Sequence, residues 1–311
     1  MKMEKKRKSL WRSLLVAPIL FLLAPLTVGF YLTHPFPART TKNPKDYGLE
    51  FEEIEFFSRK DRVKLSGWWI AACSSKKSNK VVVTAHGYTN ERSMEGIEGL
   101  QLAKALSENG YNVLMFDFRN SGKSQGRTTG IGYFERHDLF SAIDYTIQEK
   151  KQEKIAILGW SMGASTALVA GCEHPSVSVI IADSPFSDLE AFLRENLSFW
   201  SKLPKRPFTP MIINSMRKLL KINPHEVSPI KNVKNGEGKS FFLIHSRTDE
   251  AIPYAESEKI IQCISSGHHK ELWLTEGVEH INSYLVYKEE YERRVLQFLN
   301  RYLIKSKSTI H

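Results

Sequence analysis

The residues best suited to chemistry surround Ser161, in the sequence Gly-Trp-Ser-Met-Gly at 159–163. An apolar, β-branched run at 155–158 precedes this pattern, and a helix-compatible stretch at 164–171 follows it. Between a strand and a helix, the glycines of Gly-x-Ser-x-Gly remove Cβ atoms that would clash, so the turn can hold the serine hydroxyl above the sheet edge. The amide of Met162 points into the same space. The pattern therefore predicts a nucleophilic serine rather than an ordinary turn serine, and it requires a base, an orienting acid and a second oxyanion donor.

The predicted base is His280, which follows the last strand-like run at 272–275. In this hypothesis His280 takes the proton from Ser161 as the serine attacks a carbonyl, and it then returns a proton to the leaving group. The remaining histidines near predicted strands or turns are expected to be structural or solvated. They are His86, His245, His268 and His269.

The predicted orienting acid is Asp249, which lies four residues after a strand-like run at 241–245. In the chain order serine, acid, histidine, the acid follows one of the strands after the serine turn. Asp249 would fix the tautomer of His280 and stabilise its imidazolium form. Asp183 and Glu250 are the alternatives, and Asp183 is expected to brace loops instead.

These side chains require a sheet whose strands end at one edge. Strands that are separated by helices imply a mostly parallel sheet that is covered on both faces, with ligands at the carboxyl ends of the strands. Segments 50–57 and 62–72 alternate apolar and polar residues, which predicts an antiparallel hairpin. Residues 187–238 contain aromatics, prolines and short helical runs without a strand, which predicts an inserted helical cap.

A series of short motifs runs between residues 80 and 303. They are His86-Gly87-Tyr88, Asp117-Phe118-Arg119-Asn120-Ser121-Gly122-Lys123-Ser124, Gly159-Trp160-Ser161-Met162-Gly163, Asp183-Ser184-Pro185, Asp249 with Ile252-Pro253, and Gly277-Val278-Glu279-His280. In this order they resemble the α/β-hydrolases, and among them the cap-bearing serine hydrolases of the serine aminopeptidase-like type.

The resemblance implies an α/β-hydrolase fold: a mostly parallel sheet of about eight strands, flanked by helices and carrying a helical cap. It also implies an oxyanion hole that is made by the backbone N–H groups of Tyr88 and Met162. Two positions depart from the family pattern, because Asn120 and Ser246 stand where glycine is usual. Asparagine tolerates a positive φ better than most residues, so the turn at Asn120 can survive. The resemblance does not imply a substrate, since this fold hosts many chemistries.

The N-terminal segment is apolar and follows a basic tail. Residues 13–32 form a stretch of 20 residues without a charge, which is enough to cross a hydrocarbon core of about 30 Å. We therefore expect residues 1–34 to be a basic tail and a transmembrane anchor (the helix within 10–32), followed by a tether at 35–49 and a hydrolase domain at 50–311. The basic tail predicts a cytoplasmic N-terminus and an extracytoplasmic catalytic domain. A signal peptide that is cleaved to release a secreted protein is the alternative.

The composition excludes several classes of function. The chain of 311 residues has a formal net charge of +10, but half of the excess lies in residues 1–12, and we find no nucleic-acid-binding motif. Three widely spaced cysteines, Cys73, Cys172 and Cys263, indicate neither a disulfide framework nor a zinc site. We expect no metal and no organic cofactor.

These observations predict a serine hydrolase that cleaves a carboxylic ester, a thioester or an amide through an acyl-enzyme on Ser161. The expected substrate is a small or lipid-like molecule with an apolar acyl part. A serine aminopeptidase-like peptidase is an alternative, and it would need an acidic group near the site to hold a free amine. An acyltransferase is another alternative, and the intact set of three side chains argues against a non-catalytic scaffold. The cap carboxylates that could hold an amine are Asp188, Glu190, Glu195 and Glu226.

Overall fold

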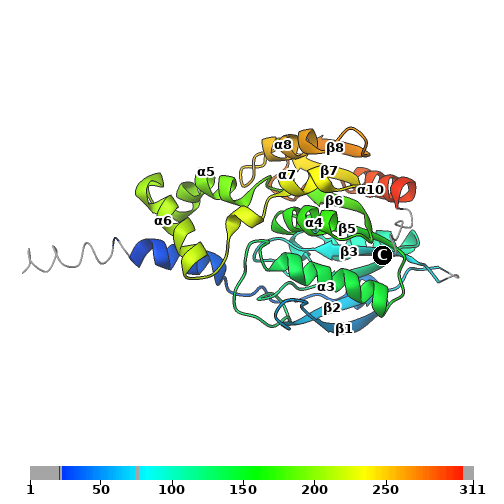
Figure 1. The fold of residues 1–311 in the computed structure, drawn as a ribbon. Helices are drawn as coiled ribbons and strands as arrows, with labels where there is room; N and C mark the ends of the chain where they lie inside the picture. The colour runs from blue at the N-terminus through cyan, green and yellow to red at the C-terminus, as the bar shows by residue number, and fades with distance from the viewer. Residues whose placement is uncertain (1–20, 22, 75–76, 304–311) are drawn as a thin grey trace, which may run out of the picture.

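The computed structural model describes residues 21, 23–74 and 77–303, and within them eight strands form one sheet in the order β1-β2-β4-β3-β5-β6-β7-β8 (Figure 1). The strands are β1 (Phe51–Phe57), β2 (Lys64–Ile70), β3 (Lys80–Ala85), β4 (Asn112–Phe116), β5 (Lys154–Trp160), β6 (Val177–Asp183), β7 (Ser240–Ser246) and β8 (Lys270–Thr275). The β1–β2 and β2–β4 pairs are antiparallel, and the other pairs are parallel. The predicted hairpin and the mostly parallel sheet are confirmed.

Helices cover both faces of the sheet. They are α2 (Gly99–Glu108), α3 (Glu135–Gln148), α4 (Met162–Glu173), α8 (Ala255–Cys263), α9 (Ser283–Val286) and α10 (Lys288–Tyr302), with short 3-10 helices η1 (Pro44–Tyr47) and η2 (Glu95–Ile97). Alternate residues of β5 enter different cores, because successive side chains of a strand point to opposite faces. Ile155 and Ile157 pack in the apolar cluster with α3 and α4, whereas Ala156 and Leu158 pack in the cluster with α2 and α10. Burial on both faces explains why this strand is a continuous apolar run.

The segment predicted as a cap, 187–238, consists of helices between β6 and β7. They are α5 (Leu189–Ser201), α6 (Lys205–Lys218), η3 (Pro224–Glu226), α7 (Pro229–Asn232) and η4 (Val233–Asn235). Helices α5 and α6 project from one end of the sheet (Figure 1) and enclose an apolar cluster of their own, in which Leu193, Ile212 and Met216 are buried. Helix α7 packs back on α4, so it ties the insertion to the central layer.

About half of the predicted membrane-spanning segment, namely residues 10–20 and 22 of 10–32, lies outside the described residues. Within the described part of the chain, no helix is both long enough and apolar enough to cross a membrane. Residues 23–33 are helical, and they lie against the helices of the cap (Figure 1). Val28 and Leu32 pack on the apolar cluster of α5 and α6. The last part of the predicted span therefore contacts the catalytic domain.

A buried ion pair joins two loops at the carboxyl end of the sheet. The carboxylate of Asp117, after β4, accepts hydrogen bonds from the Nη2 of Arg92 at 2.6 Å and from the amide of Lys123 at 2.7 Å. Both ionic side chains are fully buried, and removal of either partner would leave an uncompensated charge. Asn120, in the loop that Asp117 holds, has a φ of 57°, so this asparagine adopts the left-handed geometry at a position where the resemblance leads us to expect glycine.

Candidate active site

The turn after β5 brings backbone atoms into unusually close contact. A Cβ atom at Gly159 would lie 2.4 Å from the carbonyl oxygen of Gly163, and a Cβ at Gly163 would lie 2.0 Å from the carbonyl oxygen of Ala85. Both positions therefore require glycine. Ser161 between them has φ 54° and ψ −119°, a strained conformation for a residue with a side chain. Its amide donates a 2.8 Å hydrogen bond to the carbonyl of Asp183, at the end of β6, which supports the turn.

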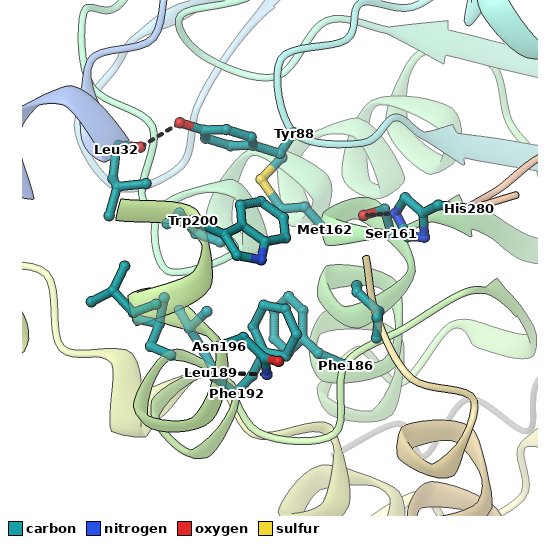
Figure 2. Close-up of a pocket in the computed structure, with 14 residues that line it drawn as sticks. Leu32, Tyr88, Ser161, Met162, Phe186, Leu189, Phe192, Asn196, Trp200 and His280 are labelled. Carbon is teal, nitrogen blue, oxygen red and sulfur yellow. Dashed lines mark hydrogen bonds between the residues drawn. The ribbon is translucent and has the colours of Figure 1, made fainter. Parts of the chain in front are cut away.

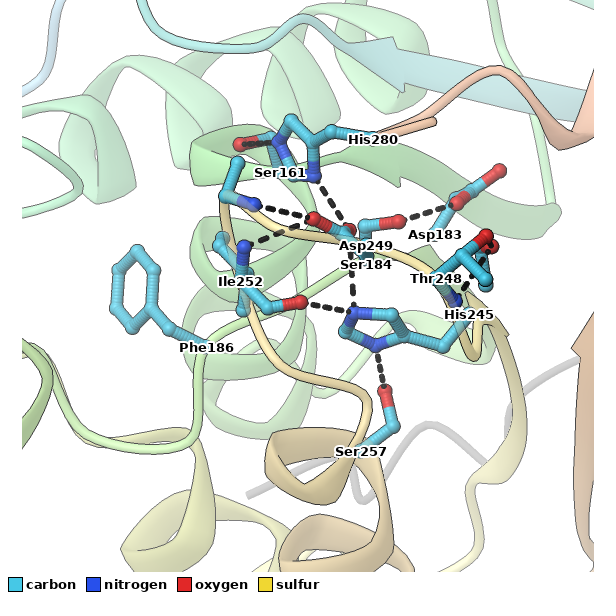
Figure 3. Close-up of polar contacts among 12 residues, drawn as sticks. Ser161, Asp183, Ser184, Phe186, His245, Thr248, Asp249, Ile252, Ser257 and His280 are labelled. Atoms are coloured by element: carbon cyan, nitrogen blue, oxygen red, sulfur yellow. Dashed lines mark hydrogen bonds and ion pairs between the residues drawn. The ribbon is translucent and has the colours of Figure 1, made fainter. Parts of the chain in front are cut away.

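The structure brings together the three residues that the sequence predicts as nucleophile, base and acid. Each follows a parallel strand: Ser161 follows β5, Asp249 follows β7 and His280 follows β8. The Nε2 of His280 lies 2.8 Å from the Oγ of Ser161, and its Nδ1 lies 2.6 Å from the Oδ2 of Asp249 (Figure 3). Because a carboxylate accepts only, Nδ1 carries a proton and the neutral ring accepts the serine proton at Nε2. The ring is in the tautomer that a general base needs.

Asp249 is held from several directions. Its Oδ1 accepts hydrogen bonds from the amides of Ala251 at 2.9 Å and Ile252 at 2.8 Å. Burial alone would raise the pKa of Asp249, but hydrogen bonds from His245 and His280 outweigh burial and hold this pKa well below its usual range. The carboxylate therefore stays ionised at neutral pH and can balance a positive charge on His280.

His245 is a second histidine beside Asp249. Its Nε2 lies 2.9 Å from the carbonyl oxygen of Ile252 and 3.3 Å from the Oδ2 of Asp249, and its Nδ1 lies 2.7 Å from the Oγ of Ser257 (Figure 3). Since a carbonyl can only accept, Nε2 carries the proton and Nδ1 accepts from the serine. We expected a structural role for His245, and the contacts place it directly against the acid loop.

Two further candidates from the sequence are occupied elsewhere. His86 donates from Nδ1 to the carbonyl of Gly87 at 2.8 Å and accepts at Nε2 from the amide of Phe118 at 3.0 Å. Burial lowers the pKa of His86, which keeps the ring neutral. Asp183 accepts from the hydroxyl of Ser184 at 2.9 Å and from that of Tyr291 at 3.1 Å. Burial raises the pKa of Asp183 to about 6, and the serine hydrogen bond opposes the rise. Within the described residues, neither side chain is hydrogen-bonded to the Ser161 hydroxyl.

The remaining candidates also lie apart from Ser161. His268 and His269 are in the turn before β8, at the amino end of that strand, where His269 stacks on the ring of Tyr302 with centroids 4.4 Å apart. Glu250 is exposed next to Asp249. Within the described residues, no cluster of three or more histidine, cysteine, aspartate or glutamate side chains could hold a metal ion.

Two residues whose backbone amides have no protein acceptor among the described residues lie beside the serine. Gly87 lies so close that a Cβ there would be 3.5 Å from the Cβ of Ser161, and Tyr88 and Met162 line the same pocket as that serine. In the described part of the chain neither the Tyr88 amide nor the Met162 amide donates a hydrogen bond to a protein acceptor. Both are therefore free to bind an oxygen atom of a ligand. The phenol of Tyr88 points the other way and donates a 2.8 Å hydrogen bond to the carbonyl of Leu32 (Figure 2).

The pocket in front of Ser161 is almost wholly apolar (Figure 2). Among the described residues, the polar groups in its wall besides Ser161 and His280 are the phenol of Tyr88, the indole N–H of Trp200 and the amide of Asn196. This amide donates back to the carbonyl of Phe192 at 3.0 Å. The wall is formed by Leu32, Tyr88, Ile131, Ser161, Met162, Phe186, Leu189, Phe192, Leu193, Asn196, Leu197, Trp200, Ile252 and His280.

Sequence reasoning identified only part of this wall. Of the cap aromatics, Phe192 and Trp200 line the pocket, whereas Phe199 and Phe208 do not. Leu32 was missed because its apolar segment was interpreted as a membrane span. Ile131 lies in a loop with no pattern that marks it, so one sequence carries no signal for it.

The low pKa of Asp249 predicts how stability depends on pH. A carboxyl group whose pKa is lower in the folded than in the unfolded chain stabilises the fold above its unfolded pKa of about 3.9, and this contribution is lost as the pH falls below that value. The free energy of unfolding of the native chain should therefore exceed that of Asp249→Asn at pH 7, and the difference should shrink between about pH 4 and pH 3. Urea titrations of both proteins at each pH measure it. A difference that grows on acidification would contradict the assignment.

Comparisons with known proteins agree with the fold. Residues 76–235 match the family described as serine aminopeptidase, S33. An esterase from Pyrococcus furiosus is 30% identical and superposes with a TM-score of 0.70, covering 86% of this chain and 98% of the esterase. The uncharacterized protein YqkD of Bacillus subtilis is 28% identical over 84% of this chain and 85% of its own length. YfhR of Escherichia coli is 24% identical over 94% of this chain and 95% of its own. The chain thus belongs to the serine aminopeptidase S33 family of α/β-hydrolase enzymes.

Proposed function

We propose that this serine hydrolase cleaves carboxylic esters that have an apolar acyl group, through an acyl-enzyme on Ser161. One observation carries the proposal: the hydrogen-bonded series Ser161–His280–Asp249 opens into a pocket whose wall contains no carboxylate and no basic side chain other than His280 among the described residues. Such a pocket favours an uncharged hydrocarbon group next to the reacting carbonyl.

In the proposed reaction the Oγ of Ser161 attacks the ester carbonyl while His280 takes its proton at Nε2. The resulting imidazolium is stabilised by Asp249 and then protonates the departing alkoxide, which leaves as the alcohol. Water attacks the acyl-enzyme in the second half of the reaction, with His280 again acting as base, and releases the carboxylic acid and the free serine. Thioesters and amides would follow the same course with a thiol or an amine as the leaving group.

The amides of Tyr88 and Met162 are proposed to bind the oxyanion of the tetrahedral intermediates. Both belong to the wall beside Ser161, and neither has a protein acceptor within the described residues. A preorganised donor of this kind contributes about 2.7–4 kcal/mol to transition-state stabilisation in other hydrolases. Because these donors are backbone groups, side-chain substitution does not remove them.

The aminopeptidase alternative requires a carboxylate that reaches the amine of a substrate. The cap carboxylates have other partners: Asp188 caps α5 through the amide of Ala191, Glu190 binds Arg194 and Arg217, and Glu226 binds Arg136. None of these carboxylates, nor that of Glu195, lines the pocket. This placement favours the ester over the aminoacyl substrate.

Acyl transfer to an alcohol would use the same acyl-enzyme, with the alcohol in place of water.

We also propose that the N-terminal residues hold the protein at a membrane, with the catalytic domain on the extracytoplasmic side. The basic residues of 1–12 and the uncharged residues 13–32 support the proposal. Alkaline carbonate extraction of membranes that contain the full-length chain measures it. We expect the protein to remain in the pellet, and its release into the wash would contradict an anchor.

A fluorophosphonate probe should label the native chain at Ser161, because the probe traps a serine that His280 activates. Labelling should disappear in Ser161→Ala, and the turnover of a p-nitrophenyl ester should fall at least about 10⁴-fold in His280→Ala. Ser176→Ala is the matched control, since this serine precedes β6 at the opposite edge of the sheet. Absence of labelling in folded native protein, or labelling that survives Ser161→Ala, would refute the proposal.

Substrate preference should follow the length of the acyl chain. Each methylene that enters an apolar pocket contributes about 0.8 kcal/mol, so kcat/KM should rise by up to about fourfold per added methylene until the pocket is filled. In Trp200→Ala the increase in kcat/KM per methylene should be smaller, because this ring lines the pocket. The control Phe199→Ala removes a neighbouring exposed ring that is not part of the wall, and the increase should be unchanged. A panel of soluble p-nitrophenyl esters and aminoacyl amides measures both effects. Faster cleavage of the aminoacyl amides would favour the peptidase instead.

A further inference from the structure

Exposed apolar side chains gather at one end of the molecule. Among the described residues, most of the large hydrophobic side chains that are exposed belong either to residues 21–36 or to the cap. Six of them define what we call the apolar end surface. They are Leu23, Leu26 and Phe30 of the N-terminal helical segment, Phe199 and Trp200 of α5, and Leu219, which follows α6.

The two halves of this surface adjoin each other. Leu26 and Phe30 share a shallow groove with Leu219 and Leu220, so the helical segment 23–33 and α6 present one continuous apolar face. In Figure 1 the segment 23–33, in blue, lies beside α6 at the end of the molecule from which α5 also projects. The exposed fractions of Phe30 and Leu219 are 56% and 64%, which is costly in water for side chains so close together.

The same end of the molecule is strongly basic. Residues 197–224 contain six lysines and arginines and no acidic residue, which gives them a net charge of +6. Residues 1–12 add +5, so the rest of the chain has a net charge of −1. The members are Lys202, Lys205, Arg206, Arg217, Lys218 and Lys221. Of these six, only Arg217 has a carboxylate partner among the described residues, namely Glu190. The net positive charge of the chain outside residues 1–12 is thus concentrated in this segment of the cap, because acidic residues balance the basic residues elsewhere.

We propose that the apolar end surface docks on an anionic lipid bilayer. Apolar side chains that are ringed by lysine and arginine match both layers of such a surface, because the former enter the acyl region and the latter meet anionic headgroups. A second copy of this chain fits less well, since a two-fold contact would bring the basic cap helices of both copies together. A nucleic acid would satisfy the charge but would leave the apolar side chains in water.

Docking would also orient the active site. Trp200 lines the pocket of Ser161 and is itself 47% exposed within the apolar end surface, and Leu32 continues the helical segment into the pocket wall. The pocket would then open next to the bilayer, and an ester dissolved in the lipid could enter without crossing water. This consequence rests on the proposed ester hydrolysis, whereas the docking itself does not.

The docking can be measured without turnover. In full-length protein with Cys73→Ser, an environment-sensitive fluorophore is attached at Leu219→Cys or, as the matched control, at Glu271→Cys, which is exposed near the amino end of β8. A parent without an added cysteine gives the background from Cys172 and Cys263. Each protein is reconstituted with vesicles of phosphatidylcholine alone or with about one third phosphatidylglycerol, both with a spin-labelled lipid as quencher.

We expect the Leu219 label to be quenched at least about threefold more than the Glu271 label, and more strongly when phosphatidylglycerol is present. The charge reversals Lys218→Glu and Lys221→Glu together should remove most of this quenching. Lys77→Glu and Lys151→Glu, an equal charge change at exposed sites near the starts of β3 and β5, should preserve it. Thermal unfolding of each variant separates loss of docking from loss of the fold.

Equal quenching of the two labels would overturn the proposal. So would a Leu219 label that is already shielded in lipid-free solution, since another part of the chain or a second copy would then cover the surface. For the delivery of substrate, Lys218→Glu with Lys221→Glu should lower the hydrolysis of a vesicle-borne ester at least about fivefold and leave a soluble ester unchanged. Failure to cleave either ester would count against the proposed activity, whereas equal rates of native and variant protein on the vesicle-borne ester would count against delivery.

Discussion

The site depends on a close contact between two backbones, where the residue at position 163 meets the carbonyl of Ala85 at the end of β3. This contact requires that β3 and β5 be neighbours in the sheet and that no side chain intervene. It places the turn of Ser161 against the loop that carries Gly87 and Tyr88, so Ser161 lies at one pocket with two amides that have no protein acceptor among the described residues. The ends of the strands therefore position the side chains of the site, and the loops that carry these side chains can be short.

Much of this arrangement was predictable because it is encoded locally. Ser161, Asp249 and His280 each follow an apolar run, and parallel strands bring their carboxyl ends to one edge. The pocket wall was not predictable to the same degree, because it is assembled from a cap, a loop and the N-terminal segment. An apolar stretch such as residues 23–32 looks the same in a sequence whether its side chains contact lipid or protein. The structure shows that Val28 and Leu32 pack against the cap, and the sequence could not show this.

The distribution of positive charge along the chain is more informative about function than the total net charge. The sequence shows only that the other half of the excess positive charge lies outside residues 1–12. The structure shows that six basic residues share the cap with the exposed rings of Phe199 and Trp200. Among the described residues, the wall of the pocket beneath contains no lysine, arginine or carboxylate. One helical insertion thus separates a basic, apolar exterior from an uncharged interior. The two functions that we propose, ester cleavage and lipid docking, meet at Trp200 of α5, which lines the pocket and is also exposed in the apolar end surface.

The hydrogen bond from the phenol of Tyr88 to the carbonyl of Leu32 joins the wall beside Ser161 to the start of the described chain. A shortened protein that begins after Thr33, which is an obvious choice for removing an apolar leader, would lose this acceptor together with the Leu32 side chain. The Tyr88 ring would then be free to change rotamer, and the pocket would be open on that side. Selectivity measured on such a shortened enzyme would describe a different cavity from that of the full-length protein.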